Sequence, residues 1–188
     1  MKSKIAIILM ASIVGLLTAC SVSEQKQADG NKKVEVKVPF ANIKVGTDTD
    51  AHDTGLSSYP GAQPKSDDND KHRANVQIGG ENFGVKVVAV TFVSDDPPEK
   101  VIDFYRKDLK KFGDKVLECP KGLTESHSNN DADKEIRCSD SGHTENGKLD
   151  LAVGVPSRQH VVSVKPNGKG TEFSLVYVNV KGGDKETM

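Results

Sequence analysis

The chain has 188 residues, a formal net charge of −1 and three cysteines. Its length predicts one domain with appendages rather than two domains. The near-neutral charge argues against a nucleic-acid-binding protein, which usually carries a basic surplus, and no apolar run is long enough for ordinary membrane spans.

The first twenty residues have the pattern of an export signal. Lys2 and Lys4 form a short positive region, and residues 5–17 follow it without a charge. An uncharged stretch of this length matches the core of a signal peptide and is too short to cross a bilayer comfortably as a helix. It ends in the sequence LTAC at residues 17–20, which resembles the lipobox of bacterial lipoproteins.

The lipobox resemblance implies that residues 1–19 are removed and that Cys20 becomes a lipid-bearing N-terminus. Two or more acyl chains hold a protein firmly on a membrane, because each buried CH₂ contributes about 0.8 kcal/mol. In such lipoproteins an Asp after the cysteine commonly means retention in the inner membrane, so Ser21 favours the outer membrane of the bacterial envelope. The alternatives are an ordinary cleaved signal with an incidental cysteine, and an uncleaved anchor.

The mature chain is more polar than the whole sequence. Without the two lysines of the signal segment, the 26 basic residues become 24 against 27 acidic ones, a net charge of −3. Residues 20–32 are almost entirely polar and predict a flexible tether next to the lipid. We expect the protein to contact the membrane through Cys20 and to bind no nucleic acid.

Residues 33–73 predict one or two strands followed by a long loop. Apolar and charged residues alternate over residues 33–40, which is typical of a half-buried strand, and Ile43 and Val45 either continue it or pair back on it. Residues 46–73 are polar, and we expect them to form a surface loop in which only Leu56, Tyr59 and Ala62 can dock.

We expect the main sheet-plus-helix domain over residues 74–181, with a tail at 182–188. It opens with a hairpin: a short alternating run, a turn at residues 79–82 and a valine-rich run over 83–93. Because the second run has apolar residues on both faces, we expect its strand to be covered on both sides, at least in part.

A helix is predicted directly after this hairpin. Asp96 is placed as its N-cap, Pro97 at its first position and Glu99 at a capping-box spacing. Five apolar residues then repeat on one stripe: Val101, Ile102, Tyr105, Leu109 and Phe112. We expect this amphipathic helix to pack on the sheet.

The remaining segments read as strands. Residues 116–119 and 135–138 predict short strands on either side of a polar loop, and residues 148–155, 160–164 and 171–180 predict an antiparallel meander. The expected fold is therefore α+β, with a mostly antiparallel sheet, one principal amphipathic helix packed on it and one disulfide-closed loop.

The disulfide is expected between Cys119 and Cys138. Exported chains meet an oxidising compartment, where the two remaining thiols usually pair, and closing a loop of about twenty residues contributes roughly 3 kcal/mol. The alternatives are free thiols and a metal site formed with His127 and His143, although these intervals do not resemble those of zinc sites.

Other candidate chemistry is weak. Asp48, Asp50 and Asp53 resemble the start of a calcium loop, but the later positions of an EF-hand do not fit, so we expect a solvated acidic loop with weak calcium binding as the alternative. The five histidines form no paired metal motif and are expected at the surface. No catalytic or cofactor motif is present, and we expect neither a catalytic residue nor a cofactor.

Several pieces together resemble a group of bacterial lipoproteins that has no assigned activity. They are the lipobox at Cys20, the YPGA sequence at residues 59–62, the hairpin, and the VIDFY sequence at residues 101–105. The resemblance implies a small sheet-plus-helix domain in which Tyr59 and Ala62 dock on the sheet and Phe104 and Tyr105 bind the helix to it.

The sequence favours a non-enzymatic, lipid-anchored envelope protein that makes protein–protein or envelope contacts. The alternative is a lipoprotein that binds a small ligand or a metal ion in a sheet–helix cleft or in the acidic loops. An envelope hydrolase is a third hypothesis, which would need a triad assembled from distant positions.

Overall fold

The computed structural model describes residues 21–26, 32–38, 41–66, 72–80, 83–126, 135–142 and 147–182. Cys20 and the signal segment before it lie outside these ranges. Among the described residues, no helix combines the length and the apolar character that a membrane span requires.

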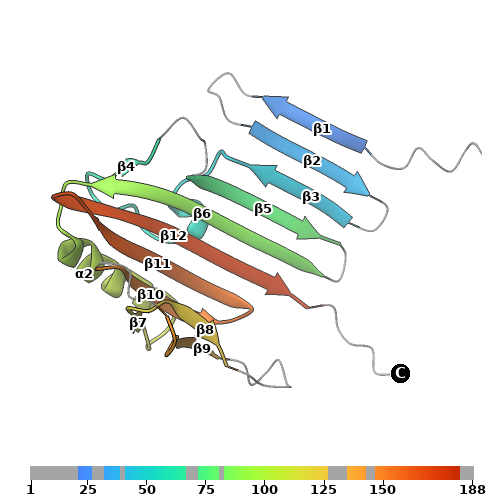
Figure 1. The fold of residues 1–188 in the computed structure, drawn as a ribbon. Coiled ribbons are helices and arrows are strands. Elements are labelled where there is room, and N and C mark those ends of the chain that lie inside the picture. Colours follow the sequence, from blue (N-terminus) through green and yellow to red (C-terminus); the bar gives the residue numbers. More distant parts are fainter. Residues whose placement is uncertain are drawn as a thin grey trace, which may run out of the picture.

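One large antiparallel sheet forms the body of the molecule (Figure 1). Its strands, in spatial order, are β1 (Ser21–Lys26), β2 (Lys32–Val38), β3 (Ala41–Gly46), β5 (Arg73–Gly79), β6 (Gly84–Ser94), β12 (Gly170–Lys181), β11 (Arg158–Asn167), β10 (Leu149–Val155) and β7 (Leu117–Cys119). The two-residue strand β4 (Gln63–Pro64) pairs with the end of β6. A separate two-stranded ribbon consists of β8 (Leu123–Glu125) and β9 (Ile136–Cys138). The α+β prediction is confirmed.

The centre of the sheet joins two units that are distant in sequence. β5 and β6 form the expected hairpin, and β10, β11 and β12 form the expected meander. β12 then pairs with β6 along its whole length, from Thr171 opposite Ser94 to Lys181 opposite Gly84. This non-local ladder makes the two units one structure.

The N-terminal segment differs from the expectation. Residues 21–26, expected within a flexible tether, form β1 and pair with β2. β3 pairs back on β2 and then with β5, so one sheet continues across residue 73, where we expected the main domain to begin. The physical reason is that main-chain hydrogen bonds hold an edge strand without apolar side chains. Figure 1 shows β1–β3 at the end of the sheet farthest from the helix.

The helix α2 (Pro98–Leu109) begins one residue later than predicted and continues as a 3-10 turn, η3 (Lys110–Phe112). Asp96 does not cap it. Instead, the carboxylate of Asp96 accepts hydrogen bonds from the Tyr59 hydroxyl and from the Lys100 ammonium, each at 2.8 Å. Pro98 can start the helix because its missing N–H is not needed in the first turn.

The core lies between α2 and one face of the sheet. Three predicted stripe residues, Val101, Tyr105 and Leu109, are completely buried. On the sheet they meet a set of buried aliphatic and aromatic side chains: Val90, Phe92, Leu151, Val153, Val162, Val164, Phe173 and Leu175. The periodicity of 3.6 residues had placed these helix positions correctly.

The segment expected to be a surface loop contributes to this core. Ala51, Leu56 and Tyr59 are buried, and the 3-10 turn η2 (His52–Thr54) lies over β6 and β12. A helix of 12 residues is about 18 Å long, so it covers only part of a sheet this wide. The loop supplies the rest of the second layer on that side.

Candidate functional site

The two faces of the sheet are unequally covered. On β6, Val88, Val90 and Phe92 face the layer of α2 and η2 and are buried, whereas Val85 on the opposite face is 36% exposed. The expectation was that β6 is covered on both sides, at least in part; on the second side Val87 and Ala89 are half-buried, and Val85 is exposed. A valine-rich run indicates that both faces of the strand are apolar, but it does not indicate whether other elements pack on both faces.

The uncovered face carries a continuous aliphatic surface, which we call the open valine face. Its residues lie on six neighbouring strands: Val34, Val36, Ile43, Val45, Ala74, Val76, Ile78, Val85, Val87, Ala89, Val161, Val176, Val178 and Val180. None of them is buried, and Val45, Ile78, Val85 and Val180 are 36–39% exposed.

The strand register aligns these residues into rows. Val34 lies opposite Val45, Val45 opposite Val76, Val76 opposite Val87 and Val87 opposite Val178. A parallel row runs from Val36 through Ile43, Ile78 and Val85 to Val180. Directly opposite β-branched side chains pack against one another across strands, so each row is a smooth, uncharged ridge.

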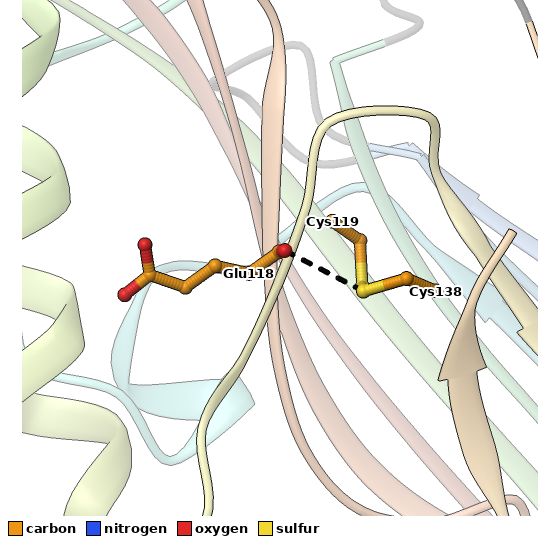
Figure 2. The surroundings of a disulfide bond; sticks show 3 residues. All are labelled: Glu118, Cys119 and Cys138. Carbon is orange, nitrogen blue, oxygen red and sulfur yellow. Dashed lines mark hydrogen bonds between the residues drawn. A yellow bond between two sulfur atoms is a disulfide. The ribbon is translucent and has the colours of Figure 1, made fainter. Parts of the chain in front are cut away.

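One end of the open valine face is bordered by the disulfide. Cys119 and Cys138 are bonded with their Cα atoms 4.9 Å apart, which confirms the predicted pair. The Sγ atom of Cys138 lies 3.4 Å from the main-chain oxygen of Glu118 (Figure 2). Because both sulfur atoms are used in this bond, neither is available as a thiolate for the alternative metal site; His127 and His143 lie outside the described residues.

The disulfide holds the β8–β9 ribbon over the same face. β9 lies against β7 and β10, and Ala152, which points to this side of β10, is completely buried. Asp150 beside it is 8% exposed, with its carboxylate 3.8 Å from the Lys148 ammonium. The ribbon therefore covers the β7–β10 end and leaves the rest of the face open.

The acidic loop uses its carboxylates to shape its own backbone. Asp50 accepts a hydrogen bond from the His52 N–H at 2.7 Å, and Asp53 accepts one from the Thr49 hydroxyl at 2.9 Å. Asp48, the third calcium candidate, is exposed. Among the described residues, no group of three or more His, Cys, Asp or Glu side chains is arranged to hold a metal ion.

His160 is buried, contrary to the expectation of surface histidines. It is 7% exposed and stacks on Phe112, with ring centroids 3.7 Å apart, and the tilted ring of Tyr177 lies 4.8 Å away. Its Nδ1 donates to the carbonyl of Thr54 at 2.9 Å. Burial lowers the pKa of His160, and the positive charge of Arg158 also lowers it, against the opposing effect of the Thr54 hydrogen bond.

The His160 ring forms part of a cleft of about 650 Å³ between η2, η3 and the β10–β12 strands. Gly55 closes η2 in the left-handed conformation (φ 79°), and a Cβ there would meet the His160 ring at 3.3 Å. Because the ring packs against two aromatic side chains and its Nδ1 is hydrogen-bonded, we assign His160 a structural role. The signal for its burial was its place in a predicted strand two residues before Val162.

Asp108 is a second buried polar residue that sequence reasoning missed. The carboxylate is 8% exposed and accepts two 2.8 Å hydrogen bonds from Ser57, one from the main-chain N–H and one from the hydroxyl. Lys111 pairs with it one helical turn later. Burial raises the pKa of Asp108, but the hydrogen bonds from Lys111 and Ser57 outweigh burial and lower the pKa overall.

Tyr59 fastens the same loop at its other end. Its ring makes edge contacts with Phe104 of α2 at 5.1 Å and with Phe173 of β12 at 5.9 Å. Its hydroxyl donates to Asp96, and burial together with this carboxylate raises the pKa of Tyr59 to about 12. Tyr105 contacts Phe173 at 5.5 Å, so both tyrosines connect a covering element to the sheet.

The polar and aromatic groups on the α2 side thus stabilise the fold. The aliphatic side chains of the open valine face remain partly exposed, and we take this face as the candidate site. No family model, curated protein or solved structure matches this chain.

Proposed function

We propose that this protein is a lipid-anchored protein of the bacterial cell envelope, favouring the outer membrane, whose domain is a non-enzymatic interaction module. The observation that carries the interaction role is the open valine face: fourteen uncharged side chains on six strands, several more than a third exposed. Large contiguous apolar patches on soluble domains mark interaction sites.

The anchor part of the proposal rests on residues 1–20. Cys20 directly precedes Ser21, the first residue of β1. Acyl chains on Cys20 would therefore hold the edge of the sheet beside the membrane, without the long tether that the composition of residues 20–32 had indicated. The domain would stay on the membrane surface with its open valine face accessible to envelope partners.

Replacing Cys20 tests the anchor. We expect Cys20→Ala to abolish metabolic labelling with palmitate and to release the protein from the membrane fraction. Ser21→Asp is the matched control, because it should keep the label and change only which membrane retains the protein. Membrane fractionation of Cys20→Ala that equals that of the natural chain would overturn the anchor.

The interaction role has its own test. Chemical crosslinking of intact envelopes, followed by purification of this chain under denaturing conditions, should yield a covalent adduct with a protein. Recovery of the chain only as an uncrosslinked monomer would contradict the interaction role.

A further inference from the structure

Among the residues whose burial the structure describes, none in β1, β2, β3 or β5 is buried. In β2, β3 and β5 the polar residues point to the α2 side and the aliphatic residues to the other side; Lys44, for example, approaches Glu35 to 3.8 Å across the strands. Among the described elements, the main contacts of α2 with the sheet are with β10, β11 and β12, at the other end from these strands. Strands with one apolar face need a second layer to be stable in water.

The segments outside the described residues of the mature chain are short or polar and are poorly suited to provide this layer. Five segments outside the described residues are strongly polar: QADGN (27–31), DDNDK (67–71), HSNNDADK (127–134), HTEN (143–146) and GDKETM (183–188). The other two such segments, 39–40 and 81–82, have only two residues each. The apolar residues 5–17 leave with the signal peptide under the function proposed above, and this step rests on that proposal.

The chemistry of the face favours a protein surface over a bilayer. No Trp or Tyr is among its fourteen residues, and the lysines at its β6–β11 end are neutralised, because Lys65 and Lys165 both pair with Glu172. Membrane-surface contacts usually combine apolar residues with aromatic and basic residues at the headgroup level. A flat field of β-branched side chains without charge fits another flat aliphatic sheet, because two sheets pack face to face about 10 Å apart with interdigitating side chains.

A second copy of this chain provides such a sheet. A two-fold axis brings the same patch onto itself, and with no charge on the patch there is no like-charge repulsion to oppose the contact. Four polar uncharged residues next to the patch, Thr91, Gln159, Ser163 and Ser174, can be buried as well, since Thr91 and Ser174 already share a 2.8 Å hydrogen bond. Beyond them the interface ends at the ion pairs of Glu172 with Lys65 and Lys165.

The size of the face agrees with a small specific interface. From the strand spacing and the rise per residue, each side chain occupies ~32 Å² of sheet, so the fourteen residues and the four polar residues next to them cover roughly 600 Å² per copy. Two copies would bury about 1,200 Å², which lies at the lower end for specific protein–protein interfaces.

We propose that the open valine face is a dimer interface, in which two copies of this chain pack sheet against sheet. The interface extends from β2 to β11. The β8–β9 ribbon, held by the disulfide over β10, forms its border and determines how far the second sheet extends. This proposal names the partner of the interaction module as a second copy.

Two adjacent positions on β6 provide a matched crosslinking test. Val87 lies near the centre of the open valine face, and Lys86 points to the α2 side. We expect full-length Val87→Cys, treated in intact envelopes with a short bis-maleimide, to give a covalent dimer on a reducing gel. Lys86→Cys should remain monomeric under the same treatment.

A charge at the same position provides the second measurement. In the detergent-purified full chain, Val87→Glu should weaken the dimer at least tenfold in sedimentation equilibrium, because the carboxylates of the two copies meet at the two-fold axis. Lys86→Glu should leave the dissociation constant unchanged. Circular dichroism and an intact disulfide verify that each variant is folded.

Two crosslinking results would overturn the dimer: no crosslink in Val87→Cys, or equal crosslinking in both cysteine variants. Protection of the Val87→Cys thiol from maleimide by vesicles alone would also overturn it, because the bilayer would then be the occupant. Failure of the anchor is measured separately, by membrane fractionation of Cys20→Ala. A chain that crosslinks but leaves the membrane contradicts the anchor. A chain that stays on the membrane but does not crosslink contradicts the dimer.

Discussion

The side chain of Asp108 connects α2 with the loop that precedes β4 and with η3. It lies on α2, accepts both hydrogen bonds from Ser57 and pairs with Lys111. Tyr105 adds a hydrogen bond from its hydroxyl to the Ser57 carbonyl at 3.2 Å. A buried carboxylate with this many donors is stabilising only while all of them are satisfied.

We predict that Asp108→Asn lowers the free energy of unfolding by about 1–3 kcal/mol, because the amide cannot satisfy both Ser57 donors and leaves Lys111 without its charge partner. Urea unfolding measures the loss. Asp103→Asn is the control, since Asp103 is an exposed helical carboxylate paired with Arg106 and should change stability by no more than about 0.5 kcal/mol. Equal losses in the two variants would show that the Ser57 contacts do not matter.

His160 makes the stability of the fold depend on pH. Its folded-state pKa lies below the ordinary value, so the unfolded chain binds the proton more readily than the folded chain. The contribution of the neutral ring is complete above about pH 6.5 and is lost as the pH falls below that value.

We predict that the free energy of unfolding of the natural chain decreases more between about pH 8 and about pH 5 than that of His160→Phe, which keeps an aromatic ring but cannot bind a proton. Urea unfolding at several pH values gives both slopes, and the carboxylates common to both chains cancel in the comparison. Parallel slopes would mean that His160 is equally easy to protonate in the folded and unfolded states.

Among the elements, the β8–β9 ribbon depends most on a covalent bond. Its two strands have three residues each, and the segment between Cys119 and Cys138 is mostly polar. The bond closes a loop with a sequence separation of 19. The ribbon in turn covers Ala152, so it acts on the sheet as well as on its own loop.

We predict that the double variant Cys119→Ser, Cys138→Ser loses roughly 3 kcal/mol of stability through the entropy of the opened loop. A reducing agent should lower the stability of the natural chain by a similar amount and leave the double variant unchanged in urea unfolding. A natural chain that is insensitive to reduction, with its thiols shown by mass to be free, would contradict this account.

Elements that depend on local pattern were predicted well. The stripe of α2 and the meander of β10, β11 and β12 follow from periodicities of 3.6 and 2 that are visible in a few consecutive residues. β1 and β8 were missed because their pairing uses main-chain groups, which every sequence has. Leu56 and Tyr59 were predicted to dock from a surface loop, but not to form part of the main core. Their neighbours in the sequence are polar, so the sequence does not indicate that this segment packs on the sheet beside a short helix.

For the whole molecule, the distribution of layers is the decisive feature. α2, η2 and η3 cover one side of β6, β12, β11 and β10, and the disulfide ribbon covers a corner of the other side. Among the described residues, the main contacts of α2, η2 and η3 do not include β1, β2, β3 or β5, the strands that extend the sheet beyond β6. A monomer with this plan exposes an aliphatic surface to water, and association is the ordinary way to remove it.

The sequence by itself determined most strand and helix patterns and predicted the pairing of Cys119 with Cys138, because each depends on residues close together or on the chemistry of one residue type. The processing at Cys20 stays a prediction from the sequence. The tertiary structure decided which apolar face is covered. Alternating valines indicate that a strand has an apolar side, but whether another element covers that side depends on where segments distant in the sequence pack. The same long-range packing buried His160 and Asp108, and it left open the one surface for which we infer a partner.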